Sequence, residues 1–227
     1  MRTERWTGTV GLVLLGSVIA GVVFESMGPN LSQTPQQMYD SFKNENWAVM
    51  IAGAILIVQK VLIVGFAVGL ATLVARGGEK AQILSRFVLI AGGLQVAITM
   101  IYVATYVALA SVANQLTVPI VFGIFTVGDT LDLAGDPFLG LMFGAAAYGL
   151  RRVRLISRWI SYLGMAAGTL LLLGSFVILA PQGFFLALPM YLGVLLGVVW
   201  LLVVNIALVR SRQAQLDSAV APAASAV

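Results

Sequence analysis

Long apolar runs constrain this chain more than any other feature of its sequence. About 20 apolar residues in a helix cross the ~30 Å hydrocarbon core of a bilayer, where helices satisfy their own backbone groups. The runs cover residues 7–24, 47–75, 87–112, 116–150, 156–180 and 184–209. Only 10% of the residues are charged, against roughly 25% in soluble domains. We therefore expect an all-α, polytopic transmembrane helix bundle with six spans.

The second and fourth runs are longer than one straight crossing needs. Such a run either tilts strongly or continues beyond the membrane. For the fourth run a third alternative is a break near Asp136 and Pro137, because proline disfavours helix in the residue before it.

The basic residues predict the orientation. Eleven of the 13 Lys and Arg residues flank the runs on one side: Arg2, Arg5, Arg76, Lys80, Arg86, Arg151, Arg152, Arg154, Arg158, Arg210 and Arg212. The positive-inside rule makes that side cytoplasmic, so we expect both termini in the cytoplasm. A secretory signal peptide is the alternative for the first run, but removing this run would place the N-terminus outside.

The expected domain organisation is simple. Residues 1–212 form one six-helix transmembrane domain, and the Ala- and Ser-rich segment 213–227 is expected to be a disordered cytoplasmic tail. Between the first two spans, the polar segment "SMGPNLSQTPQQMYDSFKNEN" is rich in turn-forming residues and is expected to be an outer loop.

Composition also narrows the chemistry. The chain has no cysteine and no histidine, which excludes disulfides, the usual zinc sites and Ser-His or Cys-His pairs. It carries no Gly-x-Ser-x-Gly elbow and no His-Glu-x-x-His motif. We expect no catalytic residue, no metal and no cofactor. The net charge of +4 lies at the membrane flanks, so no nucleic acid partner is expected.

Besides Arg158 at the start of the fifth run, four charged residues fall within the apolar runs: Lys60, Asp129, Asp132 and Asp136. Asp129, Asp132 and Asp136 are spaced three and four residues apart and share one face of a helix. Counting about 1.5 Å per residue from the inner boundary places Lys60, Asp136 and Tyr102 at one level, roughly 21 to 22 Å up. Charges in lipid need partners. We expect Lys60 to pair with Asp136, with Asp132 as the alternative. In another interpretation Lys60 reaches the outer headgroups without meeting an aspartate, and Asp129 and Asp132 lie in an outer loop.

Further polar residues surround this level. Gln95, Thr99, Tyr102 and Tyr106 form a stripe along the third run, which we expect to face the interior. Glu25 is expected near the outer interface. The predicted ion-pair or binding cluster is Lys60, Asp136, Asp132, Tyr102 and Glu25.

Pairs of glycines four residues apart recur in four spans: Gly65 and Gly69, Gly140 and Gly144, Gly164 and Gly168, Gly193 and Gly197. Small residues at this spacing let helices approach closely. We expect them to serve packing within the bundle, with homodimerisation through one such face as the alternative.

Three function classes fit these observations. The favoured one is a non-catalytic accessory, sensor or ligand-binding bundle whose polar cleft in the outer leaflet takes a small ligand or lipid. The second is a small proton- or ion-coupled transporter that uses the Lys-Asp site. A membrane-embedded enzyme is the third, and it lacks a nucleophile with an adjacent base.

The opening "RTERWTGTVGLVLLGSVIAGVVFE", the loop ending "NENW" and the six-span layout resemble uncharacterised bacterial integral membrane proteins grouped as a domain of unknown function. The resemblance covers most of the chain. It implies a multi-pass protein of the bacterial plasma membrane, and it implies no activity and no site residues.

Overall fold

The computed structural model describes residues 3–30, 33–44, 46–176 and 184–210, with the side chains of 184–187 outside the description. Within these residues the chain is helical and contains no strand. The helices are α1 (Thr3–Ser26), α2 (Pro35–Asn44), α3 (Asn46–Ala75), α4 (Glu79–Val112), the short 3₁₀ helix η1 (Ala113–Gln115), α5 (Val118–Arg152), α6 (Arg158–Gly174) and α7 (Phe184–Arg210).

Five helices of the described part are long and apolar enough to cross a membrane. These are α1, α3, α4 together with η1, α5, and α7 from Leu188. At 17 residues, α6 lies at the lower limit of about 17 to 25 for a span. The rest of its predicted run, residues 177–180, lies outside the described residues, as does the predicted tail 213–227.

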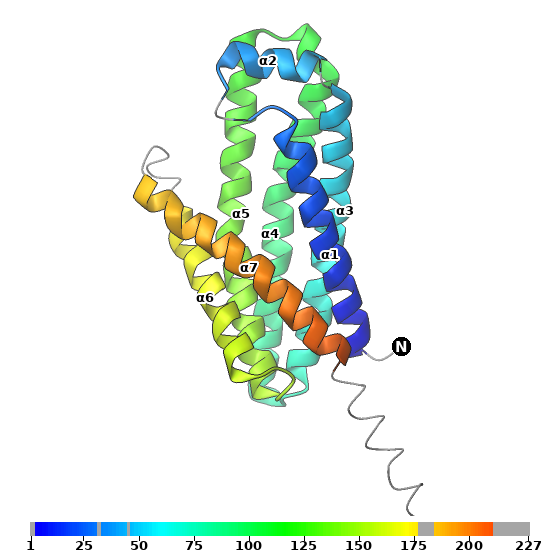
Figure 1. Ribbon diagram of the computed structural model, residues 1–227, viewed down its shortest axis with the longest axis vertical. Helices are drawn as coiled ribbons and strands as arrows, with labels where there is room; N and C mark the ends of the chain where they lie inside the picture. The colour runs from blue at the N-terminus through cyan, green and yellow to red at the C-terminus, as the bar shows by residue number, and fades with distance from the viewer. Residues whose placement is uncertain (1–2, 31–32, 45, 177–183, 211–227) are drawn as a thin grey trace, which may run out of the picture.

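The six long helices form a closed ring. Each packs against the next in chain order, α1 against α3 and then α4, α5, α6 and α7, and α7 returns to contact α1 (Figure 1). The start of α1 and the end of α7 therefore lie at the same end of the bundle, where Gly8 packs against Val209 and Asn205. Arg76 at the end of α3 also forms an ion pair there with Glu4 of α1.

Glycines explain how closely the helices approach. A Cβ on Gly69 would lie 2.4 Å from Thr7 Oγ1, and a Cβ on Gly140 would lie 2.6 Å from the backbone oxygen of Gly168. Similar tight contacts surround Gly164, Gly193 and Gly197, while Gly65 is in ordinary contact with α1. These glycines serve packing within the bundle. Gly144 differs, since a Cβ there would meet nothing within 4 Å.

The segment between α1 and α3, which we expected to be a loop, contains a helix. In α2, Met38 and Phe42 are fully buried, and the helix lies across the ends of α3, α4 and α5 (Figure 1). Its start is a capping box. The backbone N–H of Gln37 donates to Thr34 Oγ1, and the backbone N–H of Thr34 donates to Gln37 Oε1. Pro35 at the first helical position favours the same start.

The fourth predicted span is not broken. α5 is continuous through Pro137 and has 35 residues in all. Its length of about 52 Å exceeds the thickness of the hydrocarbon core, which is about 30 Å. Proline lacks the amide that would bond to the Leu133 carbonyl, so one helical hydrogen bond is absent within an intact helix. All three aspartates lie in this helix, which rules out the expected alternative of an outer loop for Asp129 and Asp132.

Candidate functional site

A cavity of about 190 Å³ lies inside the ring of helices. Every one of the six long helices contributes to its wall. The lining residues are Val18 and Glu25 of α1, Leu56, Gln59, Lys60 and Ile63 of α3, Gln95 of α4, Asp132, Asp136, Leu139 and Phe143 of α5, Leu171 of α6, and Val194, Gly197, Val198 and Leu201 of α7. The pocket therefore depends on the closed arrangement of all six helices and is not formed between any two of them.

An ion pair crosses the pocket from α3 to α5. Lys60 Nζ lies 3.8 Å from Asp132 Oδ1. The Lys60 side chain is 8% exposed, whereas that of Asp132 is 42% exposed. The lysine is thus held within the protein, and the carboxylate borders the open space of the cavity.

The sequence favoured Asp136 as the partner of Lys60, and the structure instead pairs Lys60 with Asp132. Helical side chains tilt toward the N-terminus of their helix, and the N-terminal end of α3 is the end covered by α2. The long lysine side chain therefore reaches one turn past Asp136, toward Asp132. Asp136 still lines the cavity, and Asp129 does not.

A second polar contact joins α1 to α4 beside the same cavity. The Tyr102 hydroxyl donates a hydrogen bond of 3.4 Å to Glu25 Oε1. Glu25 lines the cavity, although the sequence placed it one level further out, near the interface. The five residues of the predicted cluster thus meet at one place, with Tyr102 in contact through Glu25.

The stripe along α4 is buried, as its spacing indicates, with exposed fractions of 1 to 8%. Its members have different surroundings. Gln95 lines the cavity, and its Oε1 has no hydrogen-bond partner among the described atoms. Thr99 donates to the Gln95 carbonyl and packs against Gly135, which brings α4 close to α5 beside the aspartates.

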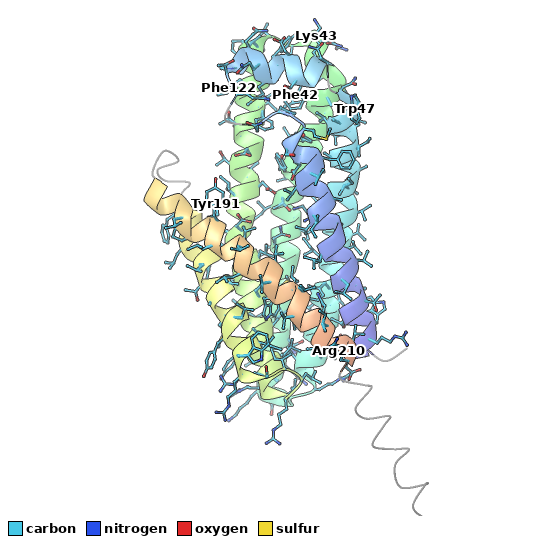
Figure 2. All side chains as sticks on the ribbon, in the orientation of Figure 1. Phe42, Lys43, Trp47, Phe122, Tyr191 and Arg210 are labelled. Atoms are coloured by element: carbon cyan, nitrogen blue, oxygen red, sulfur yellow. The ribbon has the colours of Figure 1, made fainter. Side chains whose placement is uncertain are left out.

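Tyr106, whose ring centroid lies 5.6 Å from that of Tyr102, belongs to an aromatic cluster under α2. Its ring centroid lies 5.8 Å from that of Phe42 and 6.3 Å from that of Phe125, and Phe42 and Phe125 are 5.7 Å apart. Figure 2 shows Phe42 at the end of the bundle that carries Lys43, opposite Arg210. This cluster fixes α2 on the bundle and takes no part in lining the cavity.

Part of the site was not predicted from the sequence. Gln59 of α3 lines the cavity, although it is not among the residues of the predicted cluster. The aliphatic and aromatic lining of α5, α6 and α7 carries no polar signal, so only the three-dimensional arrangement identifies it. In the part of the chain that the structure describes, no three His, Cys, Asp or Glu residues are grouped to hold a metal ion.

The arrangement combines charge with an apolar wall. One lysine faces three carboxyl groups, Glu25, Asp132 and Asp136, so the cavity has an excess of acidic groups. The rest of the lining is largely apolar and includes aliphatic side chains of α6 and α7 and the ring of Phe143 on α5. An apolar cavity with a few convergent polar groups is the usual form of a small-molecule site.

These features define a polytopic helical membrane protein with a charged pocket within its bundle. The chain belongs to the family described as Domain of unknown function (DUF4386), whose model matches residues 9–204. The matched segment includes the whole pocket lining. No curated protein and no solved structure matches the chain.

Proposed function

We propose that this protein is a non-catalytic, ligand-binding bundle of the bacterial plasma membrane that takes a small amphipathic cation in its pocket. The observation that carries the proposal is the cavity of about 190 Å³ in which three carboxyl groups outnumber one lysine. A positively charged head would relieve this excess of acidic groups, and a short apolar tail would lie against α6 and α7. Such pairing is favourable in a site with little water.

The proposal includes six spans with both termini in the cytoplasm. Figure 2 shows Arg210 at one end of the bundle and Lys43 at the other. The antiparallel order of the helices brings the expected cytoplasmic arginines and Lys80 to the Arg210 end. With the inner boundary there, α4 and α5 are long enough to continue past the outer boundary to α2.

Binding can be measured with butylammonium as the probe, by calorimetry on the protein in nanodiscs. We expect saturable binding that Asp136→Asn weakens at least tenfold, because the variant removes one of the carboxyl groups that line the cavity. Asp129→Asn is the matched control, since Asp129 lies on the same helix but outside the lining. Equal loss in both variants, or equal binding of butyrate, would reject the proposed ligand class.

Proton- or ion-coupled transport is the second candidate. Asn205, one turn beyond the lining residue Leu201 on α7, is fully buried and its amide has no partner among the described atoms. It supplies a polar group on the cytoplasmic side of the pocket. Proton-driven uptake of butylammonium into proteoliposomes, lost in Asp136→Asn, would favour transport over binding alone.

A further inference from the structure

A second cavity lies on the outside of the bundle, over the cytoplasmic half of α5. Its volume is about 360 Å³. α4 and α6 flank it, and α5 forms its floor. The lining residues are Leu84 and Phe87 of α4, Gly140, Leu141, Gly144, Ala145 and Tyr148 of α5, and Met165, Gly168, Thr169 and Leu172 of α6. We call this the outer groove.

The floor of the groove is a row of residues spaced four apart. Gly140 and Gly168 bring α5 and α6 into backbone contact at one end of the groove. Next along α5 is Gly144, where a Cβ would meet nothing within 4 Å. Packing within the bundle therefore does not explain Gly144, whose missing side chain leaves the groove open.

The same row ends on a basic residue. Residues four apart share one face of a helix, so Gly140, Gly144, Tyr148 and Arg152 follow one line toward the cytoplasmic end. The Arg152 guanidinium lies over the Tyr148 ring, 5.2 Å from its centroid. This contact holds the guanidinium at the mouth of the groove.

The flanking helices carry basic residues in equivalent places. Lys80 lies one turn before Leu84 on the lining face of α4, and Arg158 lies two turns before Met165 on that of α6. Lys80, Arg152 and Arg158 are all exposed. Of the two acidic residues at this end of the described chain, Glu4 forms an ion pair with Arg76, and Glu79 stands beside Lys80.

We infer that the outer groove binds one anionic phospholipid of the cytoplasmic leaflet. From Gly140, which lines the groove, to Arg152 beyond its end, the row of residues extends about 18 Å along α5, close to the ~15 Å of one leaflet. An acyl chain would lie over Gly144, and the phosphate would lie among Arg152, Lys80 and Arg158. Guanidinium groups bind phosphate well through paired N–H donors. The inference is independent of the ligand proposed for the inner pocket.

The test is native mass spectrometry of the full chain, released from nanodiscs that contain equal amounts of phosphatidylglycerol and phosphatidylcholine. We expect one tightly retained lipid per chain, with phosphatidylglycerol preferred. Each basic residue near an anionic headgroup contributes a factor of roughly five. Replacing Lys80, Arg152 and Arg158 together by Gln should therefore abolish the preference while the chain stays folded.

A second pair of variants tests the groove itself. Gly144→Phe fills the open space and should remove the retained lipid. Gly123→Phe is the matched control, because Gly123 is also on α5 and also has nothing within 4 Å, but lies outside the groove. Equal retention by both glycine variants, or no preference for phosphatidylglycerol in the wild type, would overturn the inference. If the wild type is a dimer without retained lipid, and Gly144→Phe converts it to a monomer, the groove binds a second copy of the chain and the lipid inference is wrong.

Discussion

Lys60 Nζ lies 3.8 Å from Asp132 Oδ1 across the inner pocket, while Asp136 lines the same pocket one turn away. The cation is thus shared among acidic groups from two other helices, since Glu25 of α1 also faces the cavity. The packing of α1, α3 and α5 against one another therefore determines which charged groups meet in the pocket.

The ion pair should make Lys60 and Asp132 energetically coupled. Lys60→Met leaves three carboxyl groups in one pocket without a cation. We expect the free energy of unfolding to fall by about 3 kcal/mol, which is the lower end of the range for broken buried ion pairs, because Asp132 is half exposed. Asp132→Leu should cost less, because Lys60 retains Asp136 and Glu25 as neighbours. The double variant should be at least about 1 kcal/mol more stable than additivity predicts.

Thermal or denaturant unfolding in detergent measures this coupling. Lys60→Met combined with Asp129→Leu provides the comparison, because Asp129 does not line the pocket. Strict additivity for Lys60 and Asp132 would mean that the contact contributes nothing to stability.

The close approach of α1 to α3 should tolerate no added methyl group. Gly69→Ala would place a Cβ 2.4 Å from Thr7 Oγ1, and overpacking of this kind costs about 1 to 3 kcal/mol. Gly16→Ala should be neutral or slightly stabilising, since a Cβ on Gly16 meets nothing within 4 Å. Adding Thr7→Ala to Gly69→Ala should restore part of the loss. Equal melting temperatures for the Gly69 and Gly16 variants would contradict the packing described for α1.

The aromatic cluster should anchor α2. Phe42 is fully buried between Tyr106 and Phe125, so Phe42→Ala should cost about 3 to 5 kcal/mol. We also expect faster proteolysis within residues 33–44, because α2 would lose its main contact with the bundle. The exposed neighbour Lys43→Ala is the control. Cleavage at the same rate in both variants would show that α2 is held by other contacts.

Cysteine labelling tests the proposed topology, because the chain contains no cysteine of its own. A cysteine at Gln36 should react with a membrane-impermeant maleimide from outside. Cysteines at Lys80 and Arg210 should react from the cytoplasm only. Labelling of the Arg210 position from outside would indicate an odd number of spans, with α6 not crossing the membrane.

Several features of the fold and site could be predicted from the sequence. The three- and four-residue spacing predicted a shared face for the aspartates, and the cost of polar groups in lipid predicted a buried stripe on α4. The favoured partner of Lys60, Asp136, was wrong and the alternative, Asp132, was right, because counting depth along straight helices ignores the direction in which side chains tilt. α2 was missed although Thr34 and Gln37 form a capping box and Met38 and Phe42 are four residues apart. The aliphatic part of the pocket lining could not be predicted, because the same types of residue line a cavity and fill a packed core.

The most direct test of the ligand proposal is protection of a single cysteine in the pocket. Val198→Cys places a thiol in the lining of the same cavity as the carboxyl groups. Its reaction with a cationic ethylammonium thiosulfonate, normalised to a cysteine at Gln36, should exceed that with the anionic sulfonate analogue. Butylammonium should slow the reaction at position 198 and leave position 36 unchanged. A faster reaction with the anionic reagent, or no protection by butylammonium, would contradict the proposal that this pocket binds an amphipathic cation.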